Sequence, residues 1–566
     1  KYNPRPANMA DRPENYINPA NVSYDTNFEL ISWNRVRNVD TFRNPTLSDR
    51  IHPENIKQGL MGDCYLIAAL SAIAEKPERI DRLLLSKEVN PQGIYSLAIF
   101  VTGIWEEVLV DDFFPITKED GEIAFCSAKT GSDLWPMLLE KVWAKVHGGY
   151  FNTNGGNEIE TLGAFTGAPC YNYQVKNRTA GDDQRVIDVK NWTLILEGER
   201  NDYIMCTGCD SEVGGLQPGH AYSLLSAHEV TDDYGETHHL LKLRNPWGHG
   251  EWTGDWSDKS PKWRGVSPQN NPGLEIKDNG IFFISFEDWK QHFGDFTICY
   301  YHDGAQYSAM KFNSSPTVPT ILEFEITVEG AYYFRTHQIN KRMKKIAEKY
   351  SYSPMILSVA RDNGISLELV GLTNGSDEQM WFKSLCTPGK YVAYVFTPWK
   401  KNSNEFTFSV YGPGQVPSFK LVGEERVGDN FLEKMVLAKA DRAPEFLTEL
   451  EPGTNLFQYD DPSDRSDSAI FVNNSATSEL TVRVRFVANG QELVIPDPAG
   501  KTLPYSILPP YSNDPTIVLK PGEKKALLYF CDEGLLVADH KFKQDAGVQV
   551  GPNPTSGVGF SYSFYI

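Results

Sequence analysis

The chain has 566 residues, of which 40% are hydrophobic and 12% aromatic, with 45 Gly and 35 Pro. This is an ordinary globular composition, which excludes wholesale disorder and a fibrous repeat, and the length predicts three to four domains at about 150 residues each. Asp and Glu number 74 against 54 Lys and Arg, so the net charge is −20. A chain this acidic is a poor candidate for binding nucleic acid through phosphate contacts.

Eight cysteines at irregular spacing are too few for a disulfide scaffold. The single CxxC, from Cys206 to Cys209, has no second pair, and it indicates a plain strand or loop pair rather than a zinc or redox site. The longest apolar run, 65–74, is shorter than the ~20 residues that cross a membrane. The first residues carry no secretory signal. We therefore expect a reduced, cytoplasmic protein.

The first half of the chain predicts helices mixed with short strands. Residues 1–50 are rich in Asn, Pro and Arg and predict an extended N-terminal arm. Apolar residues dominate 65–74 and recur at i, i+4 spacing within 134–147, so both segments predict helices. Strands are expected at 95–101, 108–110, 221–228, 239–243 and 280–285.

Beyond residue 310, polar and apolar residues alternate, which predicts antiparallel sheets with few helices. The alternation is clearest at 405–411, 480–486 and 558–566. We expect two β-sandwiches, joined near 436–455, where Pro, Glu and Asp accumulate. The basic segment 338–349 predicts a solvated turn, or a loop that contacts anionic lipid or an acidic patch of the N-terminal half.

The strongest chemical signal is QGLMGDCYLIAAL, residues 58–70. A Gly-punctuated loop delivers Cys64 to the first turn of a helix, where unpaired amides and the helix dipole favour a thiolate nucleophile. Gln58 lies on the same loop, so its amide N–H and the backbone N–H of Cys64 could form an oxyanion hole. The alternative is a buried structural cysteine behind a glycine turn.

A nucleophilic cysteine needs a base and a residue that orients the base. Among eleven histidines, His220 follows a Pro-Gly turn at the start of the apolar strand GHAYSLL. Asn245 ends a later strand in LRNPWG, where Trp247 can shield an Asn–His hydrogen bond from water. The order Cys, His, Asn is the papain-type arrangement, and a structural histidine is the alternative.

These segments resemble those of the calpains, a family of cytoplasmic, calcium-regulated cysteine proteases. QGLMGDCYLIAAL is similar to their nucleophile segment, GHAYSLLSA to their histidine segment, and RNPWGHGEWTGDWSD, residues 244–258, to their asparagine segment. The helix LLEKVWAK, residues 138–145, is also similar, and the resemblance covers about 45–300. The sequence contains no D-x-[DN]-x-[DN]-G calcium loop, so it resembles an atypical calpain without a penta-EF-hand domain.

The resemblance implies an α+β fold, in which a papain-like, two-lobed calpain protease core is followed by two antiparallel β-sandwich domains. The expected parts are an N-terminal arm at 1–50, a lobe with the nucleophile at 51–155, a lobe with His and Asn at 156–305, a calpain-type β-sandwich at 306–435 and a second β-sandwich at 436–566.

The resemblance also assigns chemical roles. They are Cys64 as nucleophile, His220 as general base, Asn245 as its orienting residue, Gln58 as oxyanion donor and Trp247 as the family's gating tryptophan. That tryptophan can wedge between the lobes of calpains until calcium realigns them. Tyr65 stands where most calpains have Trp beside the nucleophile, and it keeps a large aromatic wall.

Calcium is the cofactor that the resemblance implies, held in each lobe by carboxylates and carbonyls of loops. The candidate ligands are Glu140 in the first lobe and Glu251, Asp258 and Asn279 in the second. Three neutral residues depart from the family's acidic pattern, namely Asn55, Asn279 and Ile281. Because neutral residues remove charge from such a site, calcium activation and its loss both stay open. Glu251 and Asp258 could equally be surface acids beside tryptophans.

We therefore expect an intracellular, calcium-dependent cysteine endopeptidase of the calpain type that makes limited cuts in protein substrates through an acyl-enzyme. Protein substrates are the expected partners, nucleic acid is not, and the β-sandwich domains could contact membranes or other proteins. Two alternatives stay open. One is a catalytically latent calpain-fold scaffold, and the other is a transglutaminase-type acyl transferase, although transglutaminases have Asp where this chain has Asn245.

Overall fold

The computed structural model divides the chain into two compact units. Unit 1 contains residues 1–304 and 342–348, and unit 2 contains 305–341 and 349–566. The structure describes residues 31–442 except Arg43, Thr130, 177–182, 316–317, 345–349 and 398–404, and beyond them 447–449, 456–461, 466–472, 480–488, 491–493, 505–507, 516–531, 543–545, 548–550 and 558–565. No helix formed by these residues has both the length and the apolar character that a membrane span requires.

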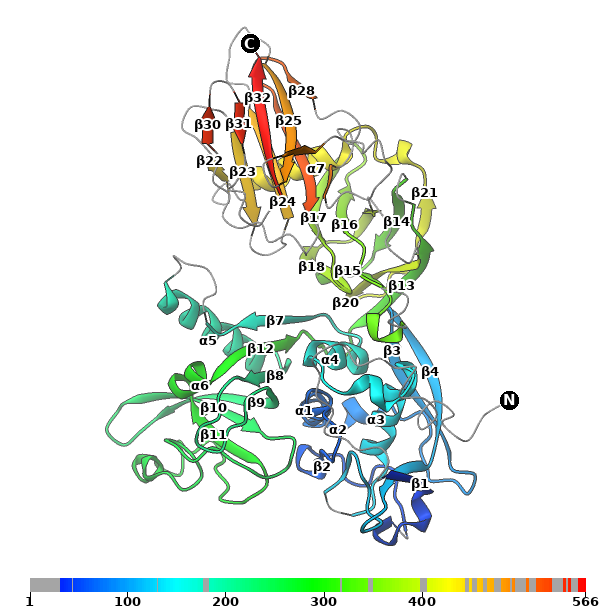
Figure 1. Cartoon of the computed structure of the whole chain (residues 1–566), viewed down its shortest axis with the longest axis vertical. Coiled ribbons are helices and arrows are strands. Elements are labelled where there is room, and N and C mark those ends of the chain that lie inside the picture. The colour runs from blue at the N-terminus through cyan, green and yellow to red at the C-terminus, as the bar shows by residue number, and fades with distance from the viewer. Residues whose placement is uncertain are drawn as a thin grey trace. The chain divides into compact units, whose positions relative to one another are not determined.

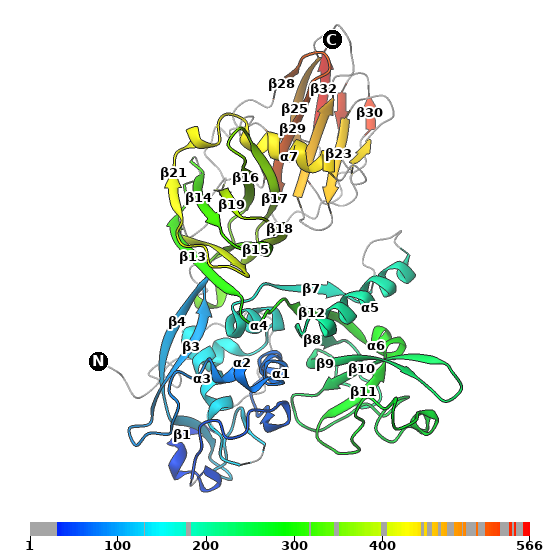
Figure 2. The same cartoon turned by 180° about the vertical axis from the view of Figure 1, so that it is seen from behind.

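The helical lobe of unit 1 is built around α1 (Cys64–Ile73), in which every residue after Cys64 is buried. A helix that is apolar on all faces belongs in a core, and α1 lies between α3 and the sheet of the other lobe (Figures 1 and 2). The other helices of this lobe are α2 (Pro77–Asp81), α3 (Trp135–Val146) and α4 (Glu158–Thr166). Its paired strands are β1 (Ile31–Arg35) with β5 (Phe113–Thr117), β2 (Ile56–Lys57) with β6 (Ser127–Ala128), and β3 (Ile94–Val101) with β4 (Ile104–Asp111).

The predicted N-terminal arm is part of this lobe where the structure describes it. Strand β1 pairs antiparallel with β5, and the backbone N–H of Thr46 donates to Ser132 at 3.0 Å. At the C-terminal end of the lobe, Thr161 of α4 donates to the carbonyl of Tyr65 at 3.3 Å and so attaches α4 to α1. Helix α4 is thus attached to the helical lobe, and the lobe boundary at 155 stays a prediction. Residues 1–30 of the predicted arm lie outside the described residues.

The sheet lobe of unit 1 is a six-stranded antiparallel sheet in the order β11-β10-β9-β8-β12-β7. Ser223 on β9 donates to the carbonyl of Ala68 at 2.7 Å, which attaches this sheet to α1. The strands are β7 (Cys170–Gln174), β8 (Ile204–Cys209), β9 (His220–Thr231), β10 (Thr237–Arg244), β11 (Ile281–Ser285) and β12 (Phe293–Cys299), and the helices are α5 (Gln184–Arg200) and α6 (Phe286–His292).

The strongly patterned elements of unit 1 are confirmed. The helices predicted at 65–74 and 134–147 are α1 and α3, and the predicted strands fall within β3, β4, β9, β10 and β11. Helix α5 was not predicted, because Val186 and Val189 on it are exposed and few of its side chains are buried, which leaves a weak apolar period. Cys206 and Cys209 lie on β8 as free, buried thiols, as expected for a plain strand pair.

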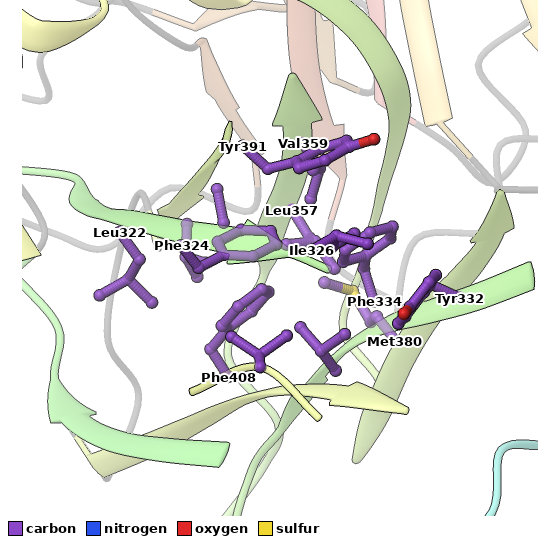
Figure 3. Packing of buried hydrophobic residues seen from close by; sticks show 14 of the residues in the cluster. Leu322, Phe324, Ile326, Tyr332, Phe334, Leu357, Val359, Met380, Tyr391 and Phe408 are labelled. Carbon is purple, nitrogen blue, oxygen red and sulfur yellow. The ribbon is translucent and has the colours of Figure 1, made fainter. Parts of the chain in front are cut away.

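Unit 2 contains two antiparallel sheets that share one core. The first has the order β13-β20-β15-β18 and the second β17-β16-β19-β14-β21. Phe334 and Phe408 from the first sheet meet Phe324, Leu357 and Tyr391 from the second (Figure 3). The strands are β13 (Gln306–Asn313), β14 (Thr320–Ile326), β15 (Gly330–His337), β16 (Met355–Asp362), β17 (Leu367–Gly375), β18 (Gln379–Cys386), β19 (Gly389–Phe396), β20 (Glu405–Gly412) and β21 (Lys420–Val422).

Helix α7 (Phe431–Arg442) covers the other face of the second sheet. Ile356 and Tyr394 on that face pack with Phe431 and Val436 of the helix. The sheet is therefore buried on both sides, which explains why β19 reads as a nearly continuous apolar run. The join between two sandwiches near 436–455 stays a prediction, and its first residues, 436–442, continue a helix whose apolar side is buried.

The C-terminal part of unit 2 also forms antiparallel sheets in the described residues. One has the order β22-β23-β24-β29-β27 and the other β26-β25-β32-β31-β30, with β28 pairing to β25. Segments 480–486 and 558–566 were predicted as strands and lie in β25 and β32, except Ile566, which is outside the described residues. The strands are β22 (Leu447–Glu449), β23 (Leu456–Asp461), β24 (Ser466–Val472), β25 (Leu480–Ala488), β26 (Gln491–Leu493), β27 (Tyr505–Ile507), β28 (Thr516–Leu519), β29 (Lys524–Cys531), β30 (Lys543–Asp545), β31 (Val548–Val550) and β32 (Val558–Tyr565).

Candidate active site

The loop before Cys64 is held close to neighbouring backbone, and this requires its glycines. A Cβ on Gly59 would lie 2.3 Å from the carbonyl oxygen of Phe125, and a Cβ on Gly62 would lie 2.2 Å from Oδ1 of Asn154. Main-chain bonds fix the same loop, since Leu60 donates to Ala124 at 2.8 Å. The glycine spacing of the segment therefore serves to pack the loop tightly and to place Cys64 at the first residue of α1.

The Cys64 thiol is half-buried beside the histidine segment. Burial raises the pKa of Cys64 to about 11, a hydrogen bond to the backbone of Ala221 opposes this, and the charges of Glu158 and Asp63 add to the rise. Ala221 directly follows His220, so the thiol lies next to the strand that carries the base. At neutral pH the resting cysteine is therefore a thiol, and it needs a base to become a nucleophile.

His220 and Asn245 form a hydrogen bond of 3.0 Å between Nε2 and Oδ1. The orientation of the Asn245 amide is determined, because its Nδ2 donates to the carbonyl of Gly250 at 2.9 Å and its Oδ1 accepts from the backbone N–H of Trp247 at 3.0 Å. An oxygen faces His220, so Nε2 must carry the proton and Nδ1 must hold the free lone pair. Burial lowers the pKa of His220, which keeps the imidazole neutral at pH 7.

Trp247 covers the histidine. Its ring centroid lies 4.6 Å from that of His220, with an angle of 41° between the planes. The indole therefore shields one face of the His220–Asn245 pair, and its backbone N–H holds Asn245.

Gln58 lies on the loop before Cys64, where the proposed oxyanion donor should be. Its Nε2 donates to the carbonyl of Met61 at 2.7 Å, and its Oε1 is buried without a hydrogen-bond partner. The backbone N–H of Gln58 donates to Pro246 at 3.0 Å, which ties this loop to the segment of Asn245. The second N–H of the amide is the group that could donate to a developing oxyanion.

Arg244 joins the two halves of the site. Its side chain is fully buried, donates to Oγ of Ser71 on α1 at 2.7 Å, and also donates to the carbonyl of Ile56. Burial lowers the pKa of this guanidinium to about 10. Because Asn245 is the next residue, Arg244 links the strand of the orienting amide to the helix of the nucleophile.

The basic segment 338–349 contributes Arg342 to unit 1. Arg342 lies in a short 3-10 helix (Lys341–Met343) and pairs with Glu160 of α4 at 2.6 Å. Its guanidinium lies 5.7 Å from the ring centroid of Tyr65, the neighbour of Cys64. The sequence left open a solvated turn, or a loop that contacts anionic lipid or an acidic patch of the N-terminal half. The contact with Glu160 agrees with the last of these.

Glu140, the first-lobe calcium candidate, and Asn55, which stands where the family has Asp, make different hydrogen bonds. The carboxylate of Glu140 accepts from the backbone N–H of Cys126 at 2.9 Å and faces Asp63, and burial raises the pKa of both acids. Asn55 instead donates from Nδ2 to Asp133 at 3.0 Å and to the carbonyl of Arg50 at 3.0 Å. Asp133 also accepts from the backbone of Asp49 and Arg50, so hydrogen bonds alone close this loop.

The second-lobe candidates do come together, but as a hydrogen-bonded loop. Oε1 of Glu251 accepts from the backbone N–H groups of Asn279 and Gly280, both at 2.9 Å, and Asp258 accepts from Lys277 at 3.2 Å. Oδ1 of Asn279 accepts from the backbone N–H of Ile281 at 2.9 Å. These oxygens thus already accept hydrogen bonds from this loop.

Lys129 of the helical lobe brings a positive charge close to this second-lobe loop. Lys129 donates from Nζ to the carbonyl of Gly248 at 2.5 Å. Burial and the charge of Arg244 lower the pKa of Lys129, and the charges of Asp278, Glu54 and Glu251 oppose this only in part. The Lys129 ammonium thus lies within the electrostatic influence of these three carboxylates.

The residues present therefore do not fit a calcium ion. Calcium requires six to eight oxygen ligands, whereas this loop has a neutral amide and an isoleucine at two ligand positions and a lysine nearby. In the described part of the chain, the one group of three His, Cys, Asp or Glu side chains with ligand atoms within 4.8 Å is Asp232, Glu236 and His238, at the turn between β9 and β10.

Sequence reasoning missed several residues that shape the site. Arg244 stood inside a recognised segment, but an arginine before a catalytic asparagine has no chemical signature of its own. Glu54, Lys129 and Asp133 stand in segments without a motif, and their importance depends on contacts between segments that are distant in the chain.

Comparison with known proteins agrees with this geometry. The family model described as "Calpain family cysteine protease" matches residues 16–300, half of the chain. The chain is 34% identical over 259 residues to the calpain-2 catalytic subunit of Mus musculus, covering 43% of this chain and 35% of that protein. It is 32% identical over 283 residues to the calpain-1 catalytic subunit of Bos taurus, covering 48% and 38%.

A plant protein is also similar to part of this chain. The chain is 30% identical over 259 residues to the calpain-type cysteine protease DEK1 of Zea mays, covering 44% of this chain and 12% of that protein. The matches thus span well under half of the length of these relatives. Within the matched region lie the nucleophile segment, the histidine segment and the asparagine segment, and the chain belongs to the calpain family of cysteine proteases.

Proposed function

We propose that this chain is an endopeptidase in which Cys64, His220 and Asn245 form the catalytic triad and Gln58 donates to the oxyanion. The observation that carries the proposal is the His220–Asn245 hydrogen bond. Its fixed amide orientation leaves Nδ1 of His220 as the acceptor, and the backbone of Ala221, the residue after His220, acts to lower the pKa of the Cys64 thiol at the start of α1.

The reaction is an acyl transfer in two halves. His220 Nδ1 takes the thiol proton as Cys64 Sγ forms a bond to the scissile carbonyl carbon. The resulting oxyanion accepts hydrogen bonds from the side-chain N–H of Gln58 and the backbone N–H of Cys64. The C–N bond breaks as the imidazolium protonates the leaving amine. Water then attacks the thioester, gives a proton to His220, and releases the acid product with the thiol restored.

The same geometry supports a papain-like arrangement of the core, with the nucleophile on a helix and the base on a sheet. We infer that the described sheets of unit 2 form the two predicted β-sandwiches. The seven cysteines whose side chains the structure describes are free, which supports a reducing compartment such as the cytoplasm. Protein substrates follow from the protease family, and contacts of unit 2 with membranes or proteins remain a prediction.

Calcium dependence is the part of the expected function that the site supports least. The loops that should hold calcium are closed by amide donors and a lysine. We therefore propose proteolysis without assigning calcium a step in it.

The test is proteolysis of casein by the full chain and its variants. Cys64→Ala and His220→Ala should each lower the rate at least about 10³-fold with little change in thermal stability. Matched controls are Cys170→Ala, at a buried thiol on β7, and His228→Ala, on the same strand as His220, which should keep the rate. Equal turnover by wild type and Cys64→Ala would refute the proposal. Incorporation of an amine into a glutamine peptide would indicate a transglutaminase instead.

A further inference from the structure

The two lobes of unit 1 are joined by a pair of polar contacts beside the triad. Nδ2 of Asn279, in the loop before β11, donates to Oε1 of Glu54 at 2.8 Å. Nζ of Lys129, which follows β6, donates to the carbonyl of Gly248 at 2.5 Å. In each contact one partner comes from the helical lobe and the other from the sheet lobe. We call these two hydrogen bonds the interlobe clasp.

On the helical side, the clasp is attached to the loop that leads to the nucleophile. Glu54 lies in the 3-10 helix Pro53–Asn55, and the backbone N–H of Lys129 donates to Asn55 at 3.2 Å. Strand β2 then pairs with β6 and leads directly into Gln58 and the Cys64 loop. A displacement of Glu54 or Lys129 would therefore move the oxyanion donor.

On the sheet side, the clasp is attached to the orienting asparagine. The backbone N–H of Asn245 donates to Gly280 at 2.8 Å, next to Asn279, and the backbone N–H of Gly248 donates to Asn245 at 2.9 Å. A Cβ on Gly280 would lie 2.9 Å from the Asn245 carbonyl oxygen, so the two loops touch. Gly248 is thus hydrogen-bonded to Asn245 directly, and Asn279 precedes Gly280, which is hydrogen-bonded to Asn245.

The clasp therefore connects the Cys64 loop to Asn245 without a metal. We propose, resting on the function proposed above, that Glu54, Lys129 and Asn279 are positioning residues that align the two lobes, so that this core is catalytically competent without calcium. The polarity of the Glu54–Asn279 bond is essential, because an amide can donate to a carboxylate whereas a second carboxylate would repel it. Lys129 adds a side-chain donor that reaches a main-chain carbonyl of the other lobe.

The first experiment compares peptide and casein turnover by the wild-type full chain in a chelator and in added calcium. We expect Cys64-dependent turnover in the chelator and less than about a twofold change on adding calcium. Turnover that requires calcium would overturn the clasp while leaving the proposed function intact. The absence of Cys64-dependent turnover in both conditions would refute the proposed function, and the clasp with it.

The second experiment reverses the polarity of one contact. Asn279→Asp should lower kcat at least about tenfold in the chelator, whereas Glu54→Gln, which still offers an acceptor oxygen, should lower it less than about threefold. When both substitutions are combined, the amide introduced by Glu54→Gln can donate to the carboxylate introduced by Asn279→Asp, so kcat should recover to within about threefold of the wild-type value. A double variant as slow as Asn279→Asp would overturn the pairing, because general destabilisation would not be repaired by a second change.

The third experiment tests the lysine. Lys129→Met should lower kcat about tenfold with KM nearly unchanged, and Lys129→Arg, which keeps a charged donor, should retain most of kcat. Lys87→Met, at an exposed lysine of the same lobe that pairs with Asp81, and Asn270→Asp, at an exposed asparagine of the sheet lobe, are matched controls and should keep the wild-type rate. Thermal stability is measured for every variant. Wild-type kcat in both Lys129→Met and Asn279→Asp would overturn the proposal.

Discussion

Replacement of Asn245 by Ala tests whether this residue orients the base. The side chain is fully buried and makes three hydrogen bonds, to His220, to the backbone N–H of Trp247 and to the carbonyl of Gly250. Ala removes all three, and the two backbone groups are left unpaired. An unpaired group costs about 1–3 kcal/mol when fully buried, and these two groups are only part-buried, so about 1–2 kcal/mol applies to each. We therefore expect the free energy of unfolding of unit 1 to fall by about 2–4 kcal/mol.

The catalytic effect of Asn245→Ala should be larger than this loss of stability. Without an acceptor on Nε2, His220 can rotate or adopt the other tautomer, so we expect kcat to fall about 10²–10⁴-fold under conditions in which the variant remains folded. The assay is peptide turnover at 25 °C, with folding checked by circular dichroism and urea titration. A kcat within about threefold of the wild-type value in the folded variant would refute the orienting role of Asn245.

Asn245→Asp is the matched variant, and its pH dependence has a defined sign. A carboxylate still accepts from Nε2 but favours the imidazolium, so it raises the pKa of His220, which burial lowers below 6.5 in the wild type. Activity requires the neutral imidazole and is lost as pH falls through this pKa. We therefore expect the acid limb of kcat/KM below pH 6.5 in the wild type and at higher pH in Asn245→Asp. An unshifted limb would contradict the assignment of His220 as the base.

Three further changes have expected outcomes. Gln58→Ala should lower kcat about 10²–10³-fold with KM unchanged, and a purely raised KM in steady-state kinetics would argue against an oxyanion donor. Lys141→Met leaves the carboxylate of Asp111 buried without its ion-pair partner and should reduce the stability of unit 1 by about 3–5 kcal/mol in urea, where a change below 1 kcal/mol would show that water reaches Asp111. Leu357→Ala should cost about 2–5 kcal/mol in unit 2 while Cys64-dependent peptide turnover persists, and an unchanged melting curve would contradict the tight core of Figure 3.

Local pattern was sufficient for much of the fold. Helices α1 and α3 and the alternating strands of unit 2 were predicted because their apolar period is strong and their burial is one-sided or complete. Helix α7 was missed because it begins in a polar stretch, and because only the fold shows the sheet that buries its apolar side. Helix α5 was missed because its exposed valines blur the period.

Sequence alone determined the chemical parts of the site, namely a cysteine at a helix start, a histidine after a turn and an asparagine before proline, because each stands in a local context with its own chemical logic. Only the tertiary structure decided how these parts are aligned. The Glu54–Asn279 and Lys129–Gly248 contacts join segments more than a hundred residues apart, and no local pattern encodes such a pair. Glu140 was predicted as a calcium ligand, and the fold places it beside Asp63 and Cys126. Asn55 and Asn279 bring amide donors to positions where the resemblance implied acidic ligands. Charge along a chain becomes a binding site only when folding brings enough oxygen ligands to one point.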